Sequence, residues 1–212
     1  MSAATRPSAL RVGYSDYVGY TPVPQAIRAY QQAHPKITIE HTEGTTQEQL
    51  DGLSSGTLEM GFFVAGRVDV PGVRSSVFWQ EPLVLVLPEG HPLAAQAEIS
   101  FHALHGQSLL CNPKESNPQT YAYLHDLFRT AAVEPQWVVK PTTRMHSYGG
   151  IMRLVAEGLG GFLIVKALSA AGYPGVIFRT VVDPELRLPF RMAWRLAVAQ
   201  DIRDELLGMI RR

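Results

Sequence analysis

Residues 37–64, ITIEHTEGTTQEQLDGLSSGTLEMGFFV, decide the fold because they show a strand, a helix and a second strand in succession. The segment 37–41 alternates apolar and polar residues, which is typical of a strand with one buried face. The segment 46–55 has leucines at helical spacing, and Gly56 predicts where that helix ends. The segment 60–64 is apolar throughout and predicts a strand buried on both faces.

The same alternation of strands and helices extends in both directions from this stretch. A strand at 10–14 and a helix with Val23, Ile27 and Tyr30 on one face precede it. The apolar run 82–87 follows and predicts a strand that crosses between two sets of elements. The later elements are expected to be strands at 109–111, 137–139, 161–165, 176–178 and 192–194, and helices at 118–132, 147–157 and 202–210.

The predicted fold class is therefore α/β, with two Rossmann-like lobes joined by crossing strands. Strand–helix–strand order favours parallel pairing with helices on the sheet faces. No Gly/Ser-rich or Pro-rich linker separates the two sets, which favours a hinge over a flexible tether. Open α/β sheets bind ligands at the carboxyl ends of their strands, so two such edges predict a ligand cleft.

Composition limits the possible functions. Lys+Arg and Asp+Glu are balanced at 19 each, so this segment lacks the basic surplus that binding of nucleic-acid phosphates requires. A single cysteine, Cys111, excludes an internal disulfide framework and fits a reducing compartment. We find neither a secretory signal nor a transmembrane-length apolar run, and we expect a soluble cytoplasmic protein without membrane contact.

Two candidate binding residues lie where a predicted strand leads into a helix. Thr45 and Thr46 each stand three residues before a Glu or Gln, which is the spacing of a capping box. One interpretation is only a capped helix. The functional interpretation is that free N–H groups and the helix dipole bind an anion there, with a threonine hydroxyl as a further donor.

Four further candidates come from two loops. Ser15 and Tyr17 lie in the loop 13–22, which has the same strand-to-helix position. His146 and Ser147 lie just before another predicted helix, and we expect them to form an opposite wall of the site. The alternative is that both loops are ordinary turns.

The sequence shows no signature of catalysis, a cofactor or a metal site. His102-x-x-His105 has one-turn spacing but no acidic or cysteine partner in the same motif. A nucleophile elbow, a P-loop and an H-E-x-x-H motif are absent. The glycines of 158–161 follow a helix and precede a strand, which is the wrong order for a dinucleotide fingerprint and indicates a helix C-cap and turn.

Seven segments, taken in order, carry a family resemblance. They are LRVGY (10–14) with Pro24, AYQQAHP (29–35), EGTT (43–46), LDGLSSGTLEMGF (50–62), EPLVLVLP (81–88), HPL (91–93) and LVAEGLG (154–160). Each segment is unspecific alone, but the ordered series resembles the effector-binding region of LysR-type transcriptional regulators.

The resemblance implies a fold similar to type 2 periplasmic binding proteins. Lobe I would comprise 10–80 and 181–212, lobe II would comprise 81–180, and 1–9 would be a linker or tail. It also implies an N-terminal winged helix-turn-helix outside this chain, which would contact DNA, and assembly into homodimers or homotetramers.

The resemblance further implies an effector site, from which this sequence departs at two positions. In relatives that sense aromatic carboxylates, hydroxyl groups of two loops hold the effector, and the threonine of the Gly-Thr pair corresponds to Thr45. The second hydroxyl position, commonly Ser or Thr, is occupied by Tyr17, with Ser15 close by. An arginine that some relatives carry corresponds to Val64.

The leading hypothesis is a sensor domain that binds a small, anionic molecule between two lobes and thereby controls transcription by the full-length protein. The first alternative is a solute-binding protein of a transport system, which a signal peptide would support. The second is an enzyme on a related two-lobed fold, which turnover of a bound ligand would reveal.

Overall fold

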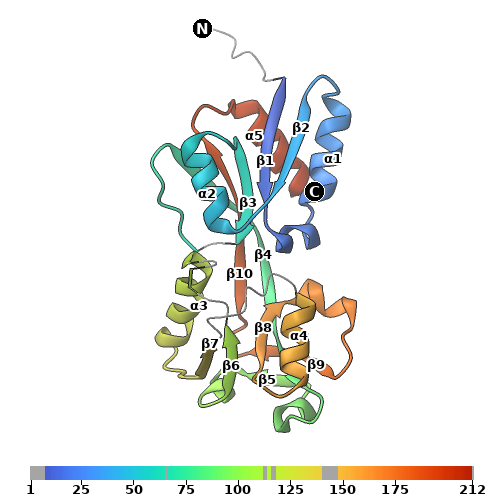
Figure 1. Cartoon of the computed structure of the whole chain (residues 1–212), viewed down its shortest axis with the longest axis vertical. Coiled ribbons are helices and arrows are strands. Elements are labelled where there is room, and N and C mark those ends of the chain that lie inside the picture. The colour runs from blue at the N-terminus through green and yellow to red at the C-terminus, as the bar shows by residue number, and fades with distance from the viewer. Residues whose placement is uncertain (1–7, 65, 112–113, 116–117, 140–147, 212) are drawn as a thin grey trace. The chain divides into compact units, whose positions relative to one another are not determined.

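The computed structural model describes residues 8–64, 66–111, 114–115, 118–139 and 148–211, and the chain forms two compact units. Unit 1 comprises residues 1–80 and 189–212, and unit 2 comprises residues 81–188. Each unit combines strands with helices (Figure 1). Both β4 (Val73–Pro88) and β10 (Arg187–Arg195) contribute residues to each unit.

Unit 1 is built on strands in the order β2-β1-β3-β10. The strands β1 (Ala9–Tyr14), β2 (Thr38–Glu43) and β3 (Met60–Val64) are parallel, as the sequence predicted, and β10 is antiparallel to β3. The helices of this unit are the 3₁₀ helix η1 (Asp16–Tyr20), α1 (Val23–Ala33), α2 (Thr46–Ser55) and α5 (Gln200–Ile210).

The predicted apolar spacing explains how the helices of unit 1 are held. The buried face of α1 consists of Val23, Ala26, Ile27 and Tyr30. Helix α2 ends at Gly56, which adopts a left-handed conformation with φ of 85°. Its buried leucines belong to a cluster beside the sheet, formed by Leu50, Leu53, Leu58, Phe63, Val73 and Ala193.

Unit 2 contains two strand arrangements. Strand β4 pairs antiparallel with β8 (Phe162–Val165) and β9 (Val176–Val182), and β5 (Glu98–Ser100) pairs parallel with β9. Strands β6 (Ser108–Cys111) and β7 (Gln136–Val139) form a parallel pair. The helices are η2 (Pro92–Ala95), η3 (Phe101–Leu104), α3 (Pro118–Thr130), α4 (Tyr148–Ala156) and η4 (Lys166–Ala171).

The structure differs from the sequence expectation at several boundaries, among them the ends of β9 and β10, the start of β4 and the end of unit 2. Strand β4 begins at Val73, not at residue 82, because its first half has the mixed polar pattern of a partly exposed strand. Unit 2 continues to residue 188, whereas we expected the chain to leave lobe II at residue 180. The reason is that β9 extends to Val182 and pairs with β4 and β5, so it stays with unit 2.

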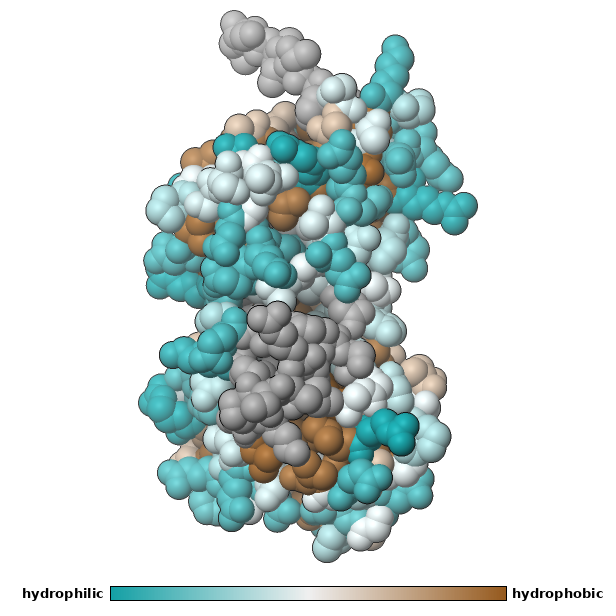
Figure 2. All heavy atoms as spheres, in the orientation of Figure 1, coloured by the Kyte–Doolittle hydropathy of each residue, from teal (hydrophilic) through white to brown (hydrophobic). Residues whose placement is uncertain are grey.

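The surface carries few large exposed apolar side chains. Among the described residues these are Tyr20, Trp79 and Leu196. Figure 2 shows the visible face of unit 1 as mainly hydrophilic, with small apolar areas between polar ones. Within the described part of the chain, no helix combines the length and apolarity needed to cross a membrane.

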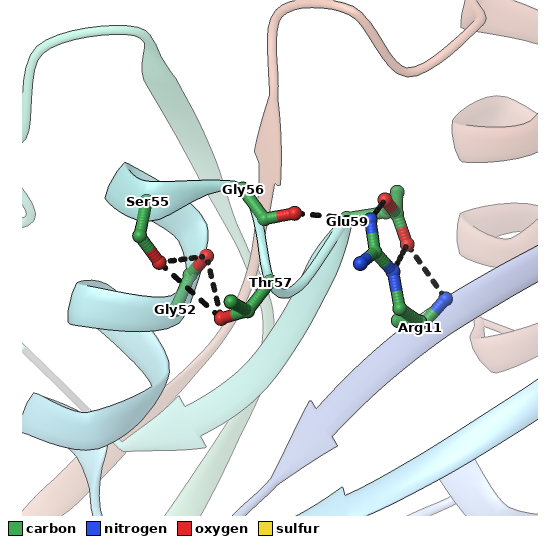
Figure 3. Close-up of polar contacts among 6 residues, drawn as sticks. All are labelled: Arg11, Gly52, Ser55, Gly56, Thr57 and Glu59. Carbon is green, nitrogen blue, oxygen red and sulfur yellow. Dashed lines mark hydrogen bonds and ion pairs between the residues drawn. The ribbon is translucent and has the colours of Figure 1, made fainter.

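Glu59 fastens the amino end of β3 to β1 (Figure 3). Its carboxylate accepts the backbone N–H of Arg11 at 2.8 Å and pairs with the Arg11 guanidinium, which also donates to the Gly56 carbonyl at 2.9 Å. Partial burial by itself would raise the pKa of Glu59, but the hydrogen bonds and charge of Arg11 outweigh it and lower that pKa below its usual value.

We expect Glu59→Gln to lower Tm by about 2–4 °C at most at neutral pH, because an ion pair that is partly open to solvent stabilises only weakly, and the Arg11 side chain is 42% exposed. A lowered folded-state pKa stabilises the fold above the unfolded-state value of 4.5, and this contribution is lost as the pH falls through the folded-state value. Glutamine at position 59 can still accept the Arg11 backbone N–H. The difference in Tm between wild type and Glu59→Gln therefore measures the contribution of the carboxylate charge. Melting curves from pH 7 to about pH 3 should converge in acid; a constant difference would contradict the assignment.

Candidate functional site

The carboxyl ends of β1, β2 and β3 meet at one edge of unit 1. In register, Tyr14 lies opposite Glu43 of β2 and opposite Phe62 of β3. Two backbone bonds join the segments that follow: Gly44 N–H donates to the Tyr14 carbonyl at 3.2 Å, and Ser15 N–H donates to the Phe62 carbonyl at 3.1 Å. Such an edge is the usual ligand position in an open α/β sheet.

Ser15 carries a buried hydroxyl at this edge. The residue is only 9% exposed, and its Oγ has no hydrogen-bond partner among the described residues. It occupies the N-cap position of η1 but makes no side-chain cap. A buried hydroxyl left without a partner is costly, and in native structures it often marks a place where a ligand or water completes the bonding. Tyr17 lies two residues further on, in η1, with a partly exposed side chain.

Thr45 is the N-cap of α2 and forms a complete capping box with Glu48. Its Oγ1 accepts the Glu48 N–H at 3.2 Å, while the Glu48 carboxylate accepts the Thr45 N–H at 2.7 Å. The hydroxyl of Thr45 also donates to the same carboxylate oxygen at 3.0 Å. The capped-helix interpretation is therefore confirmed for Thr45.

Thr46 has a different environment from Thr45. It is 1% exposed, and its hydroxyl donates to the carbonyl of Val64, the last residue of β3, at 3.2 Å. This bond fastens the first turn of α2 to β3. Thr46 thus holds the edge together, while Thr45 remains partly exposed on it.

Gln49 is a positioning residue whose role the sequence did not reveal. It is 2% exposed; its Nε2 donates to the Gly44 carbonyl at 3.1 Å, and its Oε1 accepts the Phe62 N–H at 3.1 Å. The capping-box spacing suggested a partnership with Thr46, but the cap uses Thr45 and Glu48 instead. The sequence signal for this role was a glycine in each of the two neighbouring strands, Gly13 in β1 and Gly61 in β3, which leaves room for the Gln49 side chain. A Cβ added to Gly61 would lie 3.0 Å from Gln49 Oε1.

A separate pocket lies beside α1 in unit 1. Its volume is about 220 Å³, and its lining is Tyr14, Val18, Gly19, Val23, Pro24, Ile27, Arg28, Gln31 and His41. It includes none of the predicted site residues. We place the candidate site at the strand ends, because the buried, unpaired hydroxyl and the helix N-terminus come together there.

Two predicted site residues and the His-x-x-His motif lie in other parts of the sequence. His146 and Ser147 lie outside the described residues, and the described part of α4 begins at Tyr148. His105 of the His-x-x-His motif uses its Nδ1 to accept the Glu134 N–H at 3.2 Å, which is a structural contact. The described residues contain no group of three or more His, Cys, Asp or Glu arranged to hold a metal ion.

Comparison with curated proteins shows that the chain is similar in sequence to transcriptional regulators. The chain is 27% identical over 205 residues to the HTH-type transcriptional regulator TtuA of Agrobacterium vitis, covering 95% of this chain and 66% of that protein. It is 24% identical over 190 residues to the regulator BenM of Acinetobacter baylyi, covering 88% and 60%. The chain thus spans less than two thirds of the length of either relative.

Solved structures share the fold at 22% identity. A variant of the BenM effector-binding domain aligns with a TM-score of 0.83 over 97% of this chain and 94% of that chain. The BenM effector-binding domain with its effector benzoate gives 0.80 over 96% and 90%. Full-length CbnR complexed with its target DNA gives 0.77 over 96% of this chain and 68% of that chain. The fold is that of type 2 periplasmic binding proteins, as predicted.

A family model described as the LysR substrate binding domain matches residues 4–201, almost the whole chain. The predicted family is therefore confirmed: the chain belongs to the LysR substrate-binding domains, the effector-binding domains of LysR-type transcriptional regulators.

Proposed function

We propose that this domain senses a small molecule at the carboxyl edge of β1–β3 in unit 1 and thereby controls DNA binding by a longer regulator. The observation that carries the proposal is the Ser15 hydroxyl, buried and without a partner in the described structure, at the strand edge beside the α2 N-terminus. Membership of the LysR substrate-binding domains supports the regulatory role.

The relatives support the wider parts of the proposal. BenM has been solved with its effector benzoate, and CbnR with its target DNA. We propose that DNA contact belongs to a winged helix-turn-helix outside these 212 residues, and that the full protein is a cytoplasmic homodimer or homotetramer without membrane contact. We further propose that the domain catalyses no reaction and uses no cofactor or metal. The alternative of a transport protein is not favoured, because the curated relatives are regulators.

An effector regulates only through a difference in affinity. It must bind one conformation or assembly of the regulator more tightly than another, since equal affinity shifts no equilibrium. A coupling free energy of about 1–3 kcal/mol would change DNA affinity by roughly 5- to 150-fold.

Ser15→Ala tests the proposal more cleanly than a change at Thr45. Thr45→Val removes the N-cap of α2 and should by itself cost about 1 kcal/mol of stability. Ser15→Ala removes a buried hydroxyl without a described partner, so we expect an unchanged or slightly higher Tm. Affinity for the effector should fall about tenfold, the worth of one hydrogen bond.

The measurement is a thermal-shift screen of small carboxylates, neutral aromatics and amino acids on the wild-type domain, followed by calorimetry of each hit. Binding to the folded state raises Tm, so a ligand is detected by the increase in Tm that it causes. Ser54→Ala, at an exposed position of α2, is the matched control and should bind like the wild type. A screen without hits, or equal affinity of Ser15→Ala and wild type, would sink the proposal.

A further inference from the structure

Glu48 fills the place at the α2 N-terminus that an anionic ligand would use. One oxygen of its carboxylate accepts both the Thr45 N–H at 2.7 Å and the Thr45 hydroxyl at 3.0 Å. Helix N-termini attract anions because free N–H groups and the dipole point outward. Here a carboxylate of the chain itself already uses two donors of that site.

The hydroxyl of Thr45 has a single hydrogen, and Glu48 holds it. An incoming carboxylate would therefore find no donor on that side chain and would meet a second negative charge close by. Like charges a few ångströms apart repel even at a hydrated surface. Val64, which ends β3 at the same edge and accepts the Thr46 hydroxyl at its carbonyl, is buried and carries no charge.

The same arrangement suits a ligand that donates hydrogen bonds. The carboxylate of Glu48 is exposed, and a carboxylate offers several acceptor positions. Ser15 adds a hydroxyl without a described partner, which can donate or accept. Hydroxyl, amide and ammonium groups would meet acceptors at this edge, whereas a carboxylate would meet Glu48.

We propose that Glu48 is a specificity-determining residue of the effector site, which selects at the α2 N-terminus for a hydrogen-bond donor and against a carboxylate. This inference rests on the proposed sensing function. It predicts that the effector site prefers an uncharged or donating ligand group over a carboxylate, a preference that a purely structural role of Glu48 would not produce.

The test compares two probes of the same shape on matched variants. Benzoate and benzamide differ in charge and in donor groups, and calorimetry at pH 7 gives the ratio of their affinities for each protein. Glu48→Gln removes the charge but keeps the capping box, in which Gln serves as well as Glu, so Tm should change by about 2 °C or less. Glu40→Gln removes the same charge from an exposed position in the middle of β2, away from the carboxyl edge, and is the control.

We expect the benzoate-to-benzamide affinity ratio to rise at least about tenfold in Glu48→Gln, or about 1.4 kcal/mol, and to stay at the wild-type value in Glu40→Gln. An unchanged ratio would overturn the role of Glu48, as would failure of Glu48→Gln to bind benzoate at concentrations on the order of 10 mM. Hits in the ligand screen combined with an unchanged ratio would leave the sensing function standing and remove only this inference.

Discussion

Replacing Gly160 by alanine is expected to destabilise unit 2 by about 3–5 kcal/mol, through backbone strain and a backbone clash together. Gly160 has φ of 152°, a conformation that residues with a side chain rarely adopt. An added Cβ would lie 2.8 Å from the carbonyl oxygen of Ser108 and 3.1 Å from its carbon. The contact is with main chain, so no side-chain rotation relieves it.

Neither Gly160 nor Ser108 can move away from that contact without loss of backbone hydrogen bonds. Gly161 N–H donates to the same Ser108 carbonyl at 2.8 Å, and Leu110 N–H donates to the Gly161 carbonyl at 2.7 Å. These two bonds join β6 to the start of β8, through the bridge between Leu109 and Gly161. Moving the chain away from a Cβ at residue 160 would break both.

Substitutions at two other glycines of unit 2 distinguish the cost of backbone strain from the cost of the steric clash. Gly158 has φ of 79° but no atom within 4 Å of a built Cβ, so Gly158→Ala should show strain alone, about 1–2 kcal/mol. Gly149 lies in α4 with open space around it, and Gly149→Ala should be neutral or stabilising by up to about 1 kcal/mol. Urea unfolding followed by circular dichroism gives the three free energies. A Gly160→Ala variant no weaker than Gly158→Ala would contradict the clash.

The sequence predicted the elements whose pattern is regular and whose ends are marked. The helix at 46–55 and the strand at 60–64 were located to the residue, because leucine spacing, Gly56 and a fully apolar run each mark one feature. The first half of β4 was missed, because Arg74, Ser75 and Ser76 interrupt its apolar alternation. The three-residue β5 was missed because a single apolar residue carries no period.

At the candidate site, topology was predictable and side-chain partnerships were not. Parallel order alone placed Ser15 and Thr45 at one sheet edge, which the backbone bonds there confirm. Choosing between two overlapping capping boxes was not possible from spacing, because Thr45 and Thr46 satisfy the rule equally. The choice depends on contacts across the sheet: Thr46 bonds to β3, and that leaves Thr45 as the cap.

Gln49→Ala is expected to cost about 3–5 kcal/mol and to weaken effector binding as well. The substitution leaves the Phe62 N–H and the Gly44 carbonyl without the partner that each has in a buried region, at about 1–3 kcal/mol for each group. It also leaves a small void beside the strands. The loop at Gly44 leads directly into Thr45, so a loosened loop displaces the cap of α2 and with it the Glu48 carboxylate that is proposed to accept from the ligand.

Gln49→Met separates hydrogen bonding from volume, because methionine fills similar space and offers neither a donor nor a strong acceptor. If the two bonds carry the stability, Gln49→Met should unfold almost as easily as Gln49→Ala in urea; a loss below about 0.5 kcal/mol would show that packing alone matters. The same variants decide what orders the binding edge. Thermal-shift hits that weaken in both variants would show that the edge depends on these bonds, since methionine restores the volume but not the tie between Gly44 and β3.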